Sequence, residues 1–256
     1  MRNDLETLYL SELRKARALV KKIYGGKRSL EELPNALQHY LIQSGFETYP
    51  KLHSTEILWK NTFLKFSEKG DWKPINCIQQ NFLPDPIRLV YMKTKLMGVF
   101  GLEAMDSFRH GKGNMHIKAL GIFNIANAKG EQMDSSELVT ILAETMIIPD
   151  YALYSYIHWE EIDLYTVRGT IDYHGLKASG IFYFNHNFEM IRFETYDRFL
   201  QHKDGNFLKA KWTATAADYH KKGEIRFPRS FTATWNLEAG DFLYFKGEID
   251  SIKLNQ

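Results

Sequence analysis

The sequence has little cysteine, since Cys77 is the single thiol among 256 residues. One thiol cannot form an intramolecular disulfide, and it cannot supply the several thiolates of a cysteine-rich zinc site. In an apolar stretch it is expected to behave as a small, inert hydrophobe. A reducing compartment accounts for this usage, so we expect a cytoplasmic protein. A periplasmic location stays open if the natural start lies upstream.

Long apolar runs and a secretory signal are also absent. The chain opens with Met1-Arg2-Asn3-Asp4 and an amphipathic segment, whereas a secretory signal needs an apolar stretch followed by small residues. No run approaches the roughly 18 apolar residues that span a bilayer as a helix. The sequence therefore predicts a chain that is soluble in water.

The chain also lacks an excess of one charge and the common catalytic motifs. Lys and Arg number 33 against 31 Asp and Glu, which gives a net charge of +2 and does not favour nucleic acid as a partner. The nine histidines show no metal-ligand spacing, and neither HExxH nor GxSxG occurs. We expect no metal and no cofactor.

Gly111 and Gly113 invite comparison with a phosphate-binding loop. Such a loop works because a helix follows it, and the free N–H groups of that helix point at the anion. Here the following segment, NMHIKALGIF, alternates between apolar and polar residues as a strand does. We expect Gly111-Lys112-Gly113 to supply the positive φ of a hairpin turn.

Two helical patterns precede the rest of the chain. Between Asp4 and Ile23, apolar residues recur every three or four positions. Ser29 with Glu32 forms a potential capping box, Pro34 lies near the start of a second helix, and Gly45 ends it.

We expect residues 1–45 to form a helical segment that packs on a sheet. The first helix and the turn after it carry a cluster of basic residues: Arg14, Lys15, Arg17, Lys21, Lys22, Lys27 and Arg28. This cluster is interpreted as a solvated face or as a surface for peripheral contact with an anionic membrane.

Residues 46–256 are expected to form one β-rich domain of about a dozen short strands. MHIKALGIFNIA is predicted as one strand, and alternation in MIRFETYDRF places Phe193 and Asp197 on one face with Arg198 on the other. One helix interrupts the strands, capped by Asp134-Ser135-Ser136 and ended by Pro149; its buried face is predicted to hold Leu138, Ile141, Leu142 and Thr145.

These elements predict an α+β fold. A large antiparallel sheet must curl, so we expect a half-barrel or partly closed barrel with two N-terminal helices and one covering helix from the middle of the chain.

Short motifs occur in a definite order: Leu33-Pro34 with Tyr40-Leu41; Gly70, Trp72 and Pro74; Pro84 and Pro86; Asp106, Phe108, Gly111, Gly113 and Met115; Glu144 with Pro149; Trp159; Asp197-Arg198; Trp212; Tyr219; and Gly223, Pro228 and Trp235. In this order they resemble a bacterial family known only as a domain of unknown function, across about residues 33 to 252. The resemblance implies no activity. More loosely, the strand-rich layout resembles half-barrel carriers of lipoproteins and other acylated ligands.

Four charged residues coincide with positions of that family pattern: Asp106, Glu144, Asp197 and Arg198. Each has apolar neighbours in the sequence, and a buried carboxylate must be paired. We expect Arg198 to bridge two of the acids. The cluster is interpreted as structural, with ligand binding and acid–base catalysis as alternatives.

Large aromatic residues in the strands supply either a core or a concave binding face: Trp159, Trp212, Trp235, Tyr219 and Tyr244. The leading hypothesis is a non-enzymatic binder or carrier of an apolar or acyl-bearing ligand, with Arg198 able to engage an anionic head. Its predicted ligand-binding residues are Asp106, Glu144, Trp159, Arg198, Trp212 and Tyr219.

Two alternatives stay open. The first is an enzyme in which Asp106 and Glu144 converge in an open pocket as acid and base. The second is a structural or partner-docking domain, which requires a filled interior. The sequence does not predict the oligomeric state.

Overall fold

A single curved antiparallel sheet dominates the computed structural model, which describes residues 5–20, 26–46, 52–96, 100–121, 123–201 and 205–255. The strands are β1 (Ser54–Leu64), β2 (Lys73–Phe82), β3 (Ile87–Leu96), β4 (Phe100–Arg109), β5 (Lys112–Ala119), β6 (Phe123–Ala128), β7 (Ile157–Asp163), β8 (Thr166–Tyr173), β9 (Leu176–Phe184), β10 (Met190–Gln201), β11 (Phe207–Lys222), β12 (Ile225–Leu237) and β13 (Gly240–Leu254).

Pairing of β1 with β13 joins the two halves of the sheet. Their register places Ile57 opposite Ile252. On either side the strands follow chain order as meanders, which gives the order β6-β5-β4-β3-β2-β1-β13-β12-β11-β10-β9-β8-β7. Apart from β1 and β13, neighbouring strands of the sheet are also consecutive along the chain.

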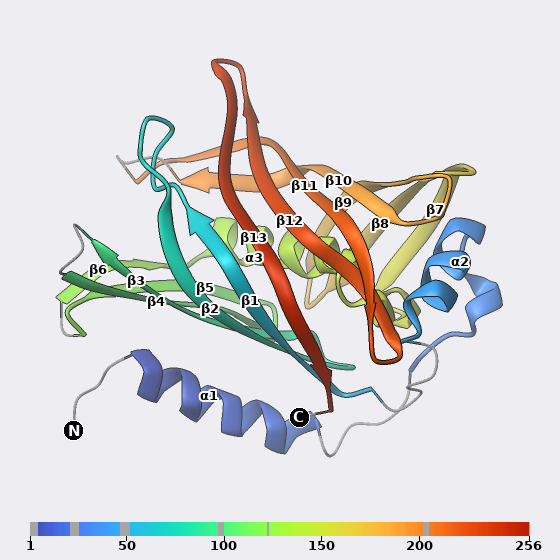
Figure 1. The fold of residues 1–256 in the computed structure, drawn as a ribbon, viewed down its shortest axis with the longest axis horizontal. Helices are drawn as coiled ribbons and strands as arrows, with labels where there is room; N and C mark the ends of the chain where they lie inside the picture. The colour runs from blue at the N-terminus through green and yellow to red at the C-terminus, as the bar shows by residue number, and fades with distance from the viewer. Residues whose placement is uncertain are drawn as a thin grey trace.

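The helix α3 (Glu131–Ala143) shows how far the sheet curls. It contacts β4 and β5 near one edge of the sheet and β8, β9 and β10 near the other. One helix can touch both ends only if the sheet wraps around it, and Figure 1 shows α3 within the curve. The expected α+β half-barrel with a covering helix is confirmed.

The helix α1 (Leu5–Val20) packs on the opposite face of β2, β3 and β4 (Figure 1). Its apolar side, which includes Leu5 and Tyr9, forms a small core with Leu89 and Tyr91 of β3. Alternation along β3 then directs Arg88 and Val90 to the inner face, where both line a cavity. Asp4, Ile23, Lys21 and Lys22 lie outside the described residues.

The helix α2 (Asn35–Ser44) contacts β12 and the 3-10 helix η4 (Pro149–Leu153). Gly45 ends α2 in the left-handed conformation, as predicted. The capping box of Ser29 and Glu32 is also present, but it caps a separate 3-10 turn, η1 (Leu30–Glu32). Pro34, which cannot donate a backbone hydrogen bond, is the N-cap of α2.

Two members of the predicted basic cluster have structural partners. Lys27 pairs with the buried Asp150 at 2.8 Å, and Arg28 donates to the carbonyl oxygens of Tyr154 and Ile157. These contacts fasten the segment before η1 to the region around η4. Since Lys27 and Arg28 are engaged, they do not extend a free basic surface beyond α1.

The mid-chain helix begins four residues earlier than the predicted cap at Asp134. Gly130 is the N-cap, and Asp134 lies in the first turn. Its carboxylate accepts from Lys112 Nζ and from the Gly113 N–H, each at 2.8 Å, so it ties the helix to β5 instead of capping it. After Ala143 the chain tightens into the 3-10 helix η3 (Glu144–Met146) before Pro149. The residues predicted for the buried face are all buried.

Residues with positive φ form the turns on either side of β5. His110 and Gly111 have φ of 50° and 72°, so the hairpin turn lies one residue before the predicted Gly111-Lys112-Gly113, and Lys112 and Gly113 already belong to β5. The strand predicted as MHIKALGIFNIA is instead the two strands β5 and β6. A second turn at Leu120 and Gly121, with φ of 53° and 71°, separates them. A leucine in the left-handed region is an uncommon turn residue, which explains the missed boundary.

Gly113 serves close packing between β5 and α3. A Cβ there would lie 2.6 Å from the carbonyl oxygen of Met133 and 2.9 Å from Glu137 Cγ. We expect Gly113→Ala to lower the free energy of unfolding by about 1–3 kcal/mol, because backbone cannot give way as a flexible side chain does. Urea denaturation measures the change. Gly101→Ala in β4 is the matched control, since its Cβ would meet no described atom within 4 Å; equal losses in the two variants would contradict this role.

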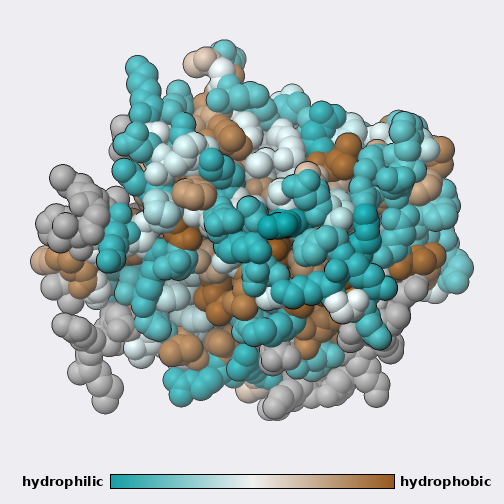
Figure 2. Space-filling view, in the orientation of Figure 1, coloured by the Kyte–Doolittle hydropathy of each residue, from teal (hydrophilic) through white to brown (hydrophobic). Residues whose placement is uncertain are grey.

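The face seen in Figure 2 is largely hydrophilic, with apolar residues in separate patches. Among the described helices, none has the length and apolar character needed to cross a membrane.

Candidate functional site

A cavity of about 320 Å³ lies between α3 and the inner face of the sheet. Apolar residues form most of its wall, including Val90, Met92, Met115, Met133 and Ile147. Aromatic residues from the middle of the sheet line the other side: Trp59, Trp212, Phe231, Trp235, Tyr244 and Phe245. The interior of the half-barrel is therefore hollow, contrary to the filled interior that a purely structural domain requires.

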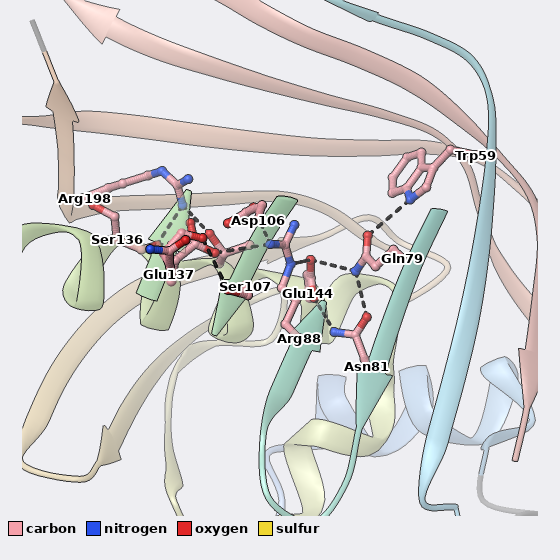
Figure 3. A network of polar contacts seen from close by, with 12 residues as sticks. Trp59, Gln79, Asn81, Arg88, Asp106, Ser107, Ser136, Glu137, Glu144 and Arg198 are labelled. Carbon is pink, nitrogen blue, oxygen red and sulfur yellow. Dashed lines mark hydrogen bonds and ion pairs between the residues drawn. The ribbon is translucent and has the colours of Figure 1, made fainter. Parts of the chain in front are cut away.

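A buried charge cluster forms one wall of the cavity (Figure 3). Arg88 lies at its centre and donates to Asp106 Oδ2 and Glu144 Oε1, each at 2.6 Å. It also pairs with Glu137 Oε2 at 3.2 Å. All four residues are at least nine-tenths buried. We name Arg88, Asp106, Glu137 and Glu144 the Arg88 cluster.

Side-chain amides extend the Arg88 cluster across β2. Gln79 donates to Glu144 Oε1 at 2.9 Å, and Asn81 donates to Glu144 Oε2 at 2.6 Å. The indole of Trp59 donates to Gln79 at 3.2 Å (Figure 3). Both oxygens of Glu144 therefore have partners, as a buried carboxylate requires.

Glu137 holds a proton more tightly than an ordinary glutamate. Burial, together with the nearby negative charges of Asp106 and Glu144, raises its pKa to about 8, against the opposing effect of Arg88 and Arg198. Near neutral pH the raised pKa therefore favours the protonated form of Glu137.

Arg198 does not bridge the acids. Its Nη1 donates to the Ser136 carbonyl oxygen at 2.9 Å and to the Thr140 hydroxyl, and its guanidinium lies 4.6 Å from the centre of the Trp212 ring. The prediction that Arg198 pairs with the cluster acids was wrong, because Arg88 already occupies that position. Arg198 still lines the cavity.

A β-bulge brings Arg198 to the cavity. Thr195 pairs with Trp212, but Arg198 pairs with Ala210, so β10 contains one extra residue between them. Phe193 and Arg198 consequently both contact the Trp212 ring, although strict alternation predicts opposite faces. Asp197 instead accepts from the Ser179 N–H and pairs with Lys209, each at 2.9 Å, away from the Arg88 cluster.

Two predicted ligand-binding residues do not line the cavity. Trp159 packs on Phe182 and donates to the Ala152 carbonyl oxygen at 3.1 Å. Tyr219 donates to the Met190 carbonyl oxygen at 2.7 Å and meets the Tyr40 ring edge-on. Both residues pack against the core, whereas the other predicted residues, Asp106, Glu144, Arg198 and Trp212, line the cavity.

Cys77 also lines the cavity but has no activating base. Burial raises the pKa of its thiol to about 12, against the lowering effect of Arg88. A thiol with such a pKa is a poor nucleophile near neutral pH. In the part of the chain that the structure describes, no group of three or more potential ligands is arranged to hold a metal ion.

Sequence reasoning missed Arg88 and Glu137. The signal for Arg88 is a single charge within the otherwise apolar strand segment IRLVYM, on the same face as Val90. Glu137 lies among Leu138, Val139 and Ile141 in a helix that is apolar on several sides, and such a helix is buried. An acid in that setting requires a buried partner.

The enzyme alternative depended on Asp106 and Glu144 converging in an open pocket. They do converge, but on the same guanidinium, with Arg88 between them in Figure 3. The buried guanidinium engages one oxygen of each carboxylate, so the two acids face a shared cation instead of an open space. This arrangement therefore favours binding over acid–base chemistry.

The fold and the cavity define a half-barrel protein with a helix-roofed, aromatic-lined interior. A family of unknown function, DUF6920, has a model that matches residues 31–254, and the chain belongs to that family. The family resemblance seen in the sequence is thereby confirmed. A comparison with curated proteins found no match.

Three crystal structures are similar in fold. An outer membrane lipoprotein-sorting protein domain from Vibrio parahaemolyticus is 10% identical, with a TM-score of 0.48, over 89% of this chain and 94% of that one. A DUF1329 family protein from Desulfovibrio piger is 8% identical, with a TM-score of 0.46, over 87% and 94%. A LolA superfamily protein from Nitrosomonas europaea is 11% identical, with a TM-score of 0.38, over 86% and 94%. At these identities and TM-scores the similarity identifies no shared ligand.

Proposed function

We propose that this protein binds or carries an apolar, acyl-bearing ligand in the cavity beneath α3. The observation that carries the proposal is the cavity itself: about 320 Å³ of space walled by aromatic, methionine and aliphatic side chains. Sites for small molecules are typically apolar pockets of roughly 300–1,000 Å³ with a few polar groups. The Arg88 cluster and Arg198 supply those polar groups at one wall.

An apolar ligand is favoured by the energetics of the wall. Each methylene transferred from water to such surroundings contributes about 0.8 kcal/mol. The Trp212 and Trp235 rings offer flat surfaces for an alkyl chain, while Met92, Met115 and Met133 adapt to its shape. The cytoplasmic location and a membrane contact through α1 stay predictions.

Native mass spectrometry with lipid extraction on freshly purified protein tests the proposal directly. We expect an apolar compound to co-purify, or added acyl compounds to bind and to raise the melting temperature. If neither occurs, the carrier function is wrong. Because a retained compound is identified by its own mass, the experiment works for an apolar ligand of any structure.

A cavity-filling variant locates the bound ligand. Ala233 lines the cavity from β12, so Ala233→Phe places a ring in the space that an acyl chain would fill. We expect at least a tenfold loss of affinity for a fluorescent acyl-chain analogue with an uncharged head, measured by titration. Ala217→Phe on the neighbouring strand β11 is the matched control, because Ala217 is exposed. Unchanged affinity in Ala233→Phe, with the fold intact by circular dichroism, would place the ligand elsewhere.

A further inference from the structure

We propose that the polar head of the ligand is a primary ammonium group, held by Asp106 and Glu137 at the wall of the cavity. This inference rests on the proposed function and adds the chemical class of the ligand, an amphiphilic amine. Four observations carry it: the charge count, an unpartnered oxygen, the engagement of Arg198 and the apolar surroundings.

The cavity wall has one negative charge in excess when its acids are ionised. Among the described residues that line it, Asp106, Glu137 and Glu144 are acidic, and Arg88 and Arg198 are basic. Water cannot screen this excess, because the three acids are at most 7% exposed. A buried charge without compensation is costly, so a proton or a cation must balance it. An anionic head would increase the imbalance.

Asp106 has an unused acceptor in this wall. Its Oδ2 accepts from Arg88, but its Oδ1 is buried and has no hydrogen-bond partner among the described residues. Glu144 differs, because Arg88, Gln79 and Asn81 occupy both of its oxygens. The free acceptor capacity therefore lies on Asp106, beside Glu137, which is bound to the same Arg88 nitrogen. An ammonium group, with three donors, matches this pair.

Arg198 is the group that would oppose a cation. Its Nη1 is directed to the Ser136 carbonyl oxygen and the Thr140 hydroxyl of α3, and its guanidinium lies over the Trp212 ring. These contacts direct the hydrogen bonds of Arg198 to the helix, although its charge still acts on Glu137. Because Arg198 Nε is buried without a partner among the described residues, an anionic head at Arg198 is the competing outcome for the experiment below.

The residues around Asp106 suit an alkyl chain. Val90 on β3 and Met115 on β5 flank Asp106 in the sheet register, and both line the cavity. A head group at Asp106 would leave its chain against these residues and the aromatic rings beyond. The same geometry gives the head one polar wall and the tail an apolar one, as amphiphile recognition requires.

Binding of an ammonium is expected to release a proton. Before the ammonium binds, the proton on Glu137 compensates the excess negative charge. The bound ammonium takes over this role, and the proton is released to the buffer. The charged groups that act on Glu137 come from β3 (Arg88), β4 (Asp106), η3 (Glu144) and β10 (Arg198). No net charge then has to enter the cavity, which favours the exchange.

Isothermal titration calorimetry with three probes of equal chain length, decylamine, decanol and decanoate, tests the inference at pH 7. We expect decylamine to bind at least tenfold more tightly than the other two. Phosphate and Tris take up protons with different enthalpies, so the difference between the binding enthalpies in the two buffers gives the number of protons released. We expect close to one proton released per decylamine bound and none per decanol bound.

Variants of Glu137 and Asp106 test whether the Arg88 cluster causes the proton release and the tight binding of decylamine. Glu137→Gln should abolish the proton release, whereas Glu160→Gln, at an exposed carboxylate of β7, should leave it unchanged. Asp106→Asn should weaken the binding of decylamine at least tenfold and the binding of decanol less than threefold. This second variant keeps the test valid if Glu137→Gln does not fold.

The outcomes separate this inference from the proposed function. Equal affinities for the three probes, or decanoate binding most tightly, would overturn the ammonium head while leaving an apolar carrier intact. Decylamine binding without proton release would also contradict the role of Glu137. Failure of all three probes to bind would count against the carrier function itself.

Discussion

Replacing Arg88 with alanine is expected to lower the free energy of unfolding by about 3–5 kcal/mol, the usual cost of removing one partner from a buried ion pair. The variant leaves the three acids of the Arg88 cluster facing one another with no cation between them. Arg88 holds two of them at 2.6 Å and the third at 3.2 Å, so no side chain of the cluster can replace it. Urea denaturation monitored by tryptophan fluorescence measures the loss.

Acid is expected to rescue part of this loss. As the pH falls, the carboxylates of Arg88→Ala take up protons and their mutual repulsion disappears, so the difference from the wild type should narrow towards pH 4. Arg168→Ala is the control, because Arg168 forms a solvent-exposed pair with Glu160 at 2.9 Å. Exposed pairs contribute roughly 0–1 kcal/mol. If the two variants lose the same stability, Arg88 does not hold the cluster together.

Replacing Glu137 with glutamine is expected to change how stability depends on pH. The pKa of Glu137 is raised from 4.5 to about 8 in the folded protein. Between these values the unfolded chain has lost this proton while the folded chain keeps it, so rising pH favours unfolding. The free energy of unfolding of the wild type should therefore fall by up to about 1.4 kcal/mol per pH unit through this group, and this decrease should end above pH 8.

Glu137→Gln removes the titrating group but keeps its shape and much of its hydrogen bonding. Its stability should fall less steeply than that of the wild type between pH 5 and pH 8, which chemical denaturation at several pH values can measure. The pKa of Asp150 is raised to about 6 by burial, and this effect is present in both proteins and cancels in the comparison. Parallel stability curves would show that Glu137 is ionised throughout this range.

Arg88 and Glu137 both determine the charge balance of the Arg88 cluster. Arg88 is required because the acids are buried, and Glu137 keeps its proton because one cation cannot balance three acids. A structural cluster with a full set of partners would need neither the proton nor a ligand. Asp106 Oδ1, which has no hydrogen-bond partner among the residues that the structure describes, distinguishes this wall from such a cluster.

Local signals in the sequence predicted most of the strands and turns. In β3, Leu89 and Tyr91 contact α1 while Arg88 and Val90 face the cavity, as alternation along a strand requires. Gly45 and Gly111 lie where positive φ is needed. These features depend on neighbours in the chain, so residue spacing is sufficient to predict them.

Partners within the site could not be predicted in the same way. Arg88 is 18 residues from Asp106, 49 from Glu137 and 56 from Glu144 along the chain. Arg198 was expected to bridge two of the acids because buried carboxylates need a cation, yet it bonds to α3 while Asp197 pairs with Lys209. A bulge such as the one in β10 cannot be recognised in a single sequence. It reverses the face of the sheet to which every later side chain on that strand points.

The sequence by itself determined the α+β class, the antiparallel meander, the two helices before it and the fact that buried acids need a cation. Only the tertiary structure decided that Arg88 is this cation, that Trp159 and Tyr219 belong to the core, and that a cavity remains beneath α3. The physical reason is that hydrophobic alternation and turn chemistry act over a few residues. Charge pairing and the shape of an enclosed space depend instead on how distant strands meet when the sheet curls around its helix.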